Sequence, residues 1–163
     1  MIFDAYKRTF VHDKDELRID WSSVACQIAA PLVASFVLIA LGIQTDQGGS
    51  FISVVSIVSG WMCATAVFLF ELRRSSMRDD KRLTGRDREA VSELFYLAVW
   101  LSAFGFLLSI FYTLVSLVDF SGIGLAEAAV SFVTVFGILH FAAVFIDFLK
   151  RLLGLFRRIS ERR

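Results

Sequence analysis

Residues 94–118 read LFYLAVWLSAFGFLLSIFYTLVSLV, a stretch that contains no Asp, Glu, Lys or Arg. A helix needs about 20 consecutive apolar residues to cross the roughly 30 Å hydrocarbon core of a bilayer. These 25 residues exceed that length, whereas the core helices of soluble domains are generally shorter and carry a polar face. The stretch therefore predicts a membrane-spanning helix.

Three further stretches lack the same four residue types, namely residues 21–45, 47–70 and 128–146. The whole chain is 56% hydrophobic and still 20% charged, so its charged side chains must be concentrated between the apolar stretches. We therefore expect an all-α membrane protein that forms a single domain, a four-transmembrane-helix bundle. Its spans are expected at residues 21–43, 51–72, 94–118 and 125–148.

The segments between the spans differ in positive charge. All 17 Lys and Arg residues lie in the N-terminal segment 1–20, the central loop 73–93 or the C-terminal tail 149–163. The two remaining loops contain neither residue type. Because Lys and Arg accumulate in cytoplasmic loops, we expect both termini and the central loop in the cytoplasm (N-in, C-in). The expected location is a bacterial inner (plasma) membrane, with residues 1–20 in the cytoplasm or at the membrane interface.

The central loop predicts a short cytoplasmic hairpin in which the second and third spans continue as helices. From Glu71 to Glu93 the chain holds seven basic and six acidic residues, and such mixed charge suits salt bridges along helices. A nucleic-acid site would need a clearer positive excess, so nucleic acid is not expected as a direct partner. The hairpin is interpreted either as a solvated connector or as a docking surface for a cytosolic protein. The candidate contact residues are Arg78, Lys81, Arg82, Arg86 and Arg88.

The C-terminal tail alternates basic residues with Leu, Phe and Ile. This pattern is typical of an amphipathic extension that contacts anionic lipid. Anchoring by the positive-inside rule explains the pattern nearly as well. The candidate lipid contacts are Lys150, Arg151, Arg157 and Arg158.

Small residues recur at three- and four-residue spacing in the second and third spans. Lipid chains are as apolar as Leu, so membrane helices associate through close packing of small side chains. These seams can close one bundle, and a seam that is left over could join subunits, so we expect a homo-oligomer. The seam residues are Ser53, Ser56, Gly60 and Ala64 in the second span and Ser102, Gly105, Ser109 and Ser116 in the third.

His140 is the only histidine inside a predicted span, and ionisable residues at such positions are costly and often functional. Its helical face continues to Asp147, about 10 Å further along the helix axis. A proton-sensitive pair of these two residues would therefore need a bridging group. The alternative is a neutral His140 that hydrogen-bonds to a neighbouring helix.

No catalytic, cofactor or metal-binding motif is recognisable, so we expect neither an enzyme nor a cofactor. The first functional hypothesis is a homo-oligomeric channel-like effector or membrane sensor that works with a cytosolic protein, as membrane components of bacterial defence systems do. The second is a transporter of a small solute or proton, centred on His140 and Gln27. The third is a structural membrane anchor.

Overall fold

The computed structural model describes residues 25–41, 48–78, 85–118 and 124–160, and every regular element in these ranges is a helix. The all-α prediction is therefore confirmed for this part of the chain. The N-terminal segment 1–20, together with Lys81 and Arg82, lies outside the described residues. In chain order the elements are the π-helical turn η1 (Ala25–Ala29), α3 (Ala30–Ala40), α4 (Gly48–Arg78), α5 (Gly85–Ser116) and α6 (Gly124–Ser160).

Three of the helices are long and apolar enough to span a membrane: Ser50–Ser75 within α4, Asp87–Ser116 within α5 and Gly124–Arg158 within α6. Inside the molecule, no more than 39% of the most apolar window of each helix is buried. The remaining apolar surface faces outward, which is typical of helices that contact lipid rather than water.

The first helix is shorter than the other three. The apolar segment Ala25–Ala40 rises about 24 Å at about 1.5 Å per residue, which is less than the bilayer core. Residues 21–24 and 42–43 of the predicted first span lie outside the described residues. Four helices thus match the predicted number, and three of them have the length of a complete span.

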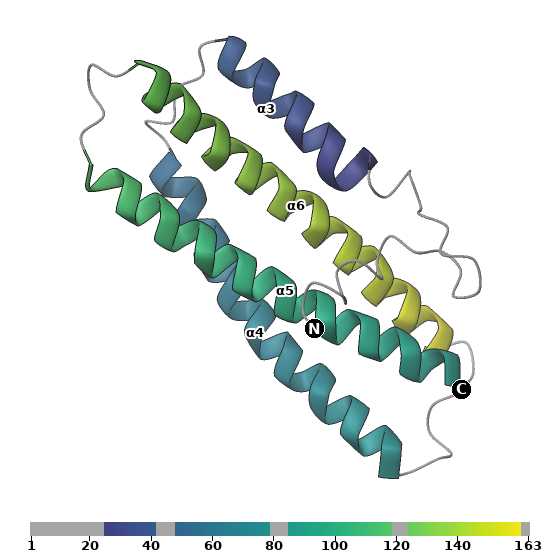
Figure 1. Ribbon diagram of the computed structural model, residues 1–163. Helices are drawn as coiled ribbons and strands as arrows, with labels where there is room; N and C mark the ends of the chain where they lie inside the picture. The colour runs from purple at the N-terminus through teal and green to yellow at the C-terminus, as the bar shows by residue number, and fades with distance from the viewer. Residues whose placement is uncertain (1–24, 42–47, 79–84, 119–123, 161–163) are drawn as a thin grey trace.

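The helices lie side by side in the order α4, α5, α6 and α3 (Figure 1). The most extensive contact joins α4 to α5, and α6 packs mainly on α5. In the described part of the chain, α3 packs on α6 and makes no comparable contact with α4 or α5. The result is a three-helix core with α3 as a peripheral fourth helix.

The contact between α4 and α5 has the periodicity of knobs-into-holes packing. Buried residues on both helices alternate spacings of three and four, the pattern that produces small crossing angles. They are Ile52, Val55, Ser59, Met62, Ala66 and Leu69 on α4, and Val91, Leu94, Ala98, Leu101, Gly105 and Leu108 on α5.

The three core helices approach most closely at Gly105. A Cβ atom added there would overlap Ser59 Oγ on α4 and come within 2.9 Å of Phe141 Cε2 on α6. One turn away, Ser56 Oγ and Ser109 Oγ form a hydrogen bond of 2.8 Å between α4 and α5. Small side chains are therefore needed at this level because the backbones lie close together.

The predicted seam residues divide between two environments. Ser56, Gly105 and Ser109 lie at the contact between α4 and α5, and Ser102 is buried. The others are exposed on the outer surface of the described helices, namely Ser53, Gly60, Ala64 and Ser116. On α4 the buried stripe follows Val55, Ser59 and Met62, so most of the predicted line of small residues faces away from α5.

The expected hairpin helices continue past the predicted spans. The helix α4 runs beyond residue 72 to Arg78, and α5 begins at Gly85, well ahead of residue 94. Near the end of α4, Arg73 lies over the Tyr96 ring of α5, with 6.0 Å between Cζ and the ring centroid. This contact joins the charged end of α4 to the beginning of the apolar stretch in α5.

Candidate functional site

The candidate site begins where a proline interrupts the first helix. Pro31 has no backbone N–H, so it cannot donate to the carbonyl four residues earlier, which belongs to Gln27. Gln27 lies in the π-helical turn η1, a kind of irregularity that is frequent at functional sites. The residue is only 3% exposed, so both its carbonyl and its amide need hydrogen-bond partners inside the protein.

His140 on α6 supplies the partner for this carbonyl. Its Nδ1 lies 2.6 Å from Gln27 O. A carbonyl oxygen can only accept, so Nδ1 carries a hydrogen and donates it, and protons are gained or lost at Nε2. The imidazole stacks on Phe136 at a centroid distance of 5.8 Å and meets Phe104 edge-on at 5.3 Å. Its orientation is therefore set by contacts from three helices.

The side chain of Gln27 makes a second link between α3 and α6. Its Nε2 donates to Asp147 Oδ2 over 3.0 Å. Gln27 thus contacts His140 through its backbone and Asp147 through its amide, and it occupies the position of the bridging group that the spacing of His140 and Asp147 requires. We call Gln27, His140 and Asp147 the polar latch, because together they join α3 to α6.

Arg151 connects the polar latch to the charged end of α6. Its Nε donates to the same Oδ2 atom of Asp147 over 3.0 Å, and one of its terminal nitrogens lies 3.8 Å from Glu93 Oε2 on α5. The side chains of Asp147 and Arg151 are 27% and 31% exposed, whereas His140 as a whole is 7% exposed. The network therefore extends from a buried imidazole to partly accessible charged groups.

The Gln27 amide also has an atom that is not satisfied. Its Oε1 is buried and accepts no hydrogen bond from any described residue. An amide has a donor end and an acceptor end, so rotation of the Gln27 amide would turn Oε1 toward Asp147 in place of Nε2. The Gln27 side chain can therefore donate or accept at this position, according to which end faces α6.

Apolar contacts support the latch without replacing it. Phe36 on α3 meets Phe132 on α6 edge-on, with centroids 6.4 Å apart. The faces of α3 that point away from α6 are exposed, as Val33 at 59% and Val37 at 50% show. The polar latch thus acts at one end of a narrow contact and can influence the position of the whole helix.

The candidate basic residues are distributed over two regions. In the first, Arg78 lies at the end of α4, while Arg86 and Arg88 lie in the first turns of α5. In the second, Lys150, Arg151 and Arg158 line a pocket between α5 and α6, whereas Arg157 is exposed and does not line it. The ion pair brings in Glu93, which the sequence-based reasoning missed because a glutamate next to an apolar stretch has no distinguishing pattern.

The contacts within the latch are hydrogen bonds. Among the described residues, no group of three or more His, Cys, Asp or Glu side chains is arranged to hold a metal ion. Cys26 and Cys63 are both exposed free thiols.

Comparisons with protein-family models, with curated proteins and with solved structures find no match to this chain.

Proposed function

We propose that the protein is a membrane sensor in which proton uptake at the polar latch changes the packing of α3 on α6 and is communicated to a cytosolic protein. The observation that carries this proposal is the hydrogen-bonded path from His140 through Gln27 to Asp147. Ionisable groups within apolar helices are costly and often functional, so a purely structural anchor has little need for this arrangement.

The position of α3 makes it suitable as the moving element. The core of α4, α5 and α6 packs without help from α3, which contacts chiefly α6. A change in the latch can therefore shift α3 while the core remains folded. A switch needs two arrangements of the contact between α3 and α6. A proton can act as the ligand that shifts the balance between them if it binds the two arrangements with different affinity.

The charged groups around the latch define its response to pH. In the described part of the chain, α3 contributes no charged residue, α5 contributes Glu93, and α6 contributes Asp147 and Arg151 beside His140. Protonated His140 donates from both ring nitrogens, and its bond to the Gln27 carbonyl becomes charge-assisted.

The experiment is a pair of spin-label distance measurements on protein in nanodiscs, with Cys26 and Cys63 replaced by alanine. Labels at Val37 of α3 and Ile110 of α5 report on the position of α3, since both sites are exposed. We expect the distance distribution to change when the pH is lowered, because the His140 imidazole gains a proton at Nε2 on acidification. The change should disappear in His140→Gln and in Asp147→Asn, and a pH-independent distribution in the unaltered latch would overturn the proposal.

A proton-linked transporter is the second candidate, and the unsatisfied Gln27 Oε1 beside Asp147 favours it. A transporter must move protons across a sealed bilayer, whereas a sensor need not. Proteoliposomes that contain a pH-sensitive dye distinguish the two. A proton flux that His140→Gln abolishes would favour the transporter.

The orientation and assembly of the protein are part of the same proposal. The distribution of Lys and Arg supports an inner-membrane orientation with both termini in the cytoplasm, where the hairpin between α4 and α5 would meet a cytosolic partner. The outer face of α4 carries exposed apolar side chains, including Phe51, Trp61 and Phe68. This face is available to lipid or to a second copy in a homo-oligomer, and native mass spectrometry in mild detergent measures the number of copies.

A further inference from the structure

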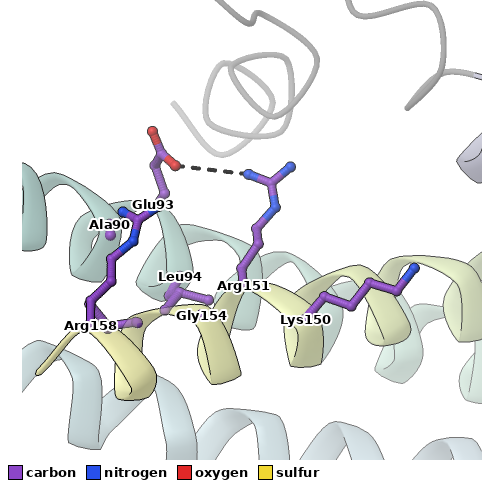
Figure 2. Close-up of a pocket in the computed structure, with 8 residues that line it drawn as sticks. Ala90, Glu93, Leu94, Lys150, Arg151, Gly154 and Arg158 are labelled. Carbon is purple, nitrogen blue, oxygen red and sulfur yellow. Dashed lines mark ion pairs between the residues drawn. The ribbon is translucent and has the colours of Figure 1, made fainter. Parts of the chain in front are cut away.

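A pocket of about 350 Å³ lies between the N-terminal part of α5 and the C-terminal part of α6 (Figure 2). It does not include the polar latch, although Arg151 lines the pocket and also donates to Asp147 of the latch. The lining residues that matter to its chemistry are Glu93 and Leu94 from α5 and Lys150, Arg151, Gly154 and Arg158 from α6.

The pocket has a positive charge in excess. Three of its lining side chains are basic and one is acidic, a balance of +2. Arg151 is already held by Asp147 and Glu93, but among the described residues neither Lys150 nor Arg158 takes part in an ion pair. In Figure 2, Arg151 and Arg158 rise from α6 on either side of Gly154, and Lys150 extends along α6 away from these two arginines. The pocket therefore presents unneutralised donors to an anion.

Gly154 keeps the space between the two arginines open. Glycine weakens a helix interior relative to alanine, so a glycine inside α6, six residues before its end at Ser160, needs a reason. Close helix packing is not the reason, because no atom lies within 4 Å of the position that its Cβ would occupy. At Gly105 and Gly137, by contrast, a Cβ atom would meet side chains of a neighbouring helix. The absence of a side chain at Gly154 leaves room for a ligand to lie against the helix backbone.

The depth of the pocket matches that of lipid headgroups. Glu93 directly precedes the apolar stretch 94–118, and Lys150 follows the apolar stretch 128–146 after only three residues. Both sides of the pocket therefore lie at the boundary between apolar and charged segments, where the phosphates of a bilayer are found. Leu94 lies in the lining beside the arginines, so the pocket offers both charged and apolar contacts.

We infer that this pocket binds the phosphate ester of an anionic phospholipid, with Arg158 and Lys150 as its main ligands and Arg151 shared between the phosphate and Glu93. Arginine suits this role because its planar guanidinium donates two parallel hydrogen bonds to phosphate oxygens. Basic pockets between membrane helices on the cytoplasmic side are a known mode of headgroup binding. The inference goes beyond the proposed sensing function, because neither Arg158 nor Lys150 belongs to the polar latch.

The test uses the full-length protein in mild detergent, exposed to equimolar phosphatidylglycerol and phosphatidylcholine and examined by native mass spectrometry. We expect selective retention of phosphatidylglycerol, and we expect the combined Lys150→Gln and Arg158→Gln variant to weaken it by about tenfold or more, the scale of lost charge-assisted bonds. The single variant Arg158→Gln should also weaken retention, and Arg157→Gln is its matched control, because it removes one positive charge at the neighbouring position outside the pocket. Equal losses in the control, or no preference for phosphatidylglycerol, would overturn the inference.

Three additional measurements keep the result interpretable. Gly154→Leu should block the lipid without removing charge, and circular dichroism verifies that its helices remain folded. Arg158→Lys should retain more binding than Arg158→Gln if the pocket holds an anion. Soluble glycerol 3-phosphate tests the source of the phosphate. If it fails to displace phosphatidylglycerol, the assignment to lipid is supported. If it displaces phosphatidylglycerol at a concentration similar to that of the lipid, the assignment to lipid is overturned. None of these variants alters His140, so a negative result here leaves the pH response of α3 to be judged by its own experiment.

Discussion

The amide nitrogen of Gln27 on the first helix lies 3.0 Å from Asp147 Oδ2 on the last helix, across 120 positions of sequence. This bond places a neutral donor against a carboxylate that directly follows the apolar stretch 128–146. It also ties the peripheral α3 to the three-helix core. The two links can therefore be removed separately, because the backbone carbonyl of Gln27 contacts His140 and its side-chain amide contacts Asp147.

Gln27→Leu removes the side-chain link and leaves the carbonyl that His140 contacts. We expect the free energy of unfolding to fall by about 1–3 kcal/mol, the usual effect of losing a buried hydrogen bond to a charged group. The measurement is thermal or denaturant unfolding in detergent. Ile28→Leu, at an exposed neighbouring position, is the control and should have little effect. Equal stability of Gln27→Leu and the control would show that the bond does not hold α3.

Pro31→Ala tests the carbonyl link instead. Alanine restores an N–H that can donate to Gln27 O within the helix, so it competes with His140. We expect little loss of stability, because the carbonyl remains satisfied, together with loss of the pH-dependent movement of α3 in the spin-label experiment. A pH response identical to that of the parent protein would mean that the proline is not required to expose this carbonyl.

Gly105→Leu should disrupt the core where α4, α5 and α6 meet. The added side chain would overlap Ser59 and Phe141, and overpacking of this kind costs about 1–3 kcal/mol or prevents folding. Gly60→Leu is the matched control, because no atom lies within 4 Å of its Cβ position. The yield of monodisperse protein and its melting temperature measure the difference. Equal tolerance at the two glycines would contradict the close approach at Gly105.

The proposed orientation predicts the accessibility of single cysteines in intact cells. In a background without Cys26 and Cys63, Ser50→Cys should react with a membrane-impermeant maleimide from outside. Thr84→Cys should react only after the membrane is made permeable, since the positively charged loop is retained in the cytoplasm. Labelling of Thr84→Cys in intact cells would reverse the topology.

Reversal of charge in the hairpin tests whether it contacts a cytosolic protein. The combined variant Arg78→Glu, Lys81→Glu and Arg82→Glu should insert and fold, because exposed ion pairs contribute only about 0–1 kcal/mol each. It should lose a complementary partner, since like charges across an interface are strongly unfavourable. Co-purification and cellular phenotype are the readouts. If both survive, the hairpin is only a connector.

The apolar stretches and the segregation of charge were sufficient to predict the helices. Residues 94–118, without one charged side chain, can form little else than a long apolar helix. Similar reasoning located α4 and α6, because a composition this apolar is not compatible with a solvated surface. The sequence also predicted that His140 and Asp147 would need a bridging group, since their separation along one helix follows from its rise per residue.

The tertiary structure decided which face of each helix is buried and what the bridge is. In a membrane protein the faces toward lipid and toward other helices are both apolar, so composition did not distinguish the stripe through Ser59 and Met62 from the line through Gly60 and Ala64. The contact of Gln27 with His140 and Asp147 likewise depends on α3 packing against α6. Helical periodicity is a local property, so it can be predicted from the sequence. Which faces of distant helices meet depends on close packing in three dimensions.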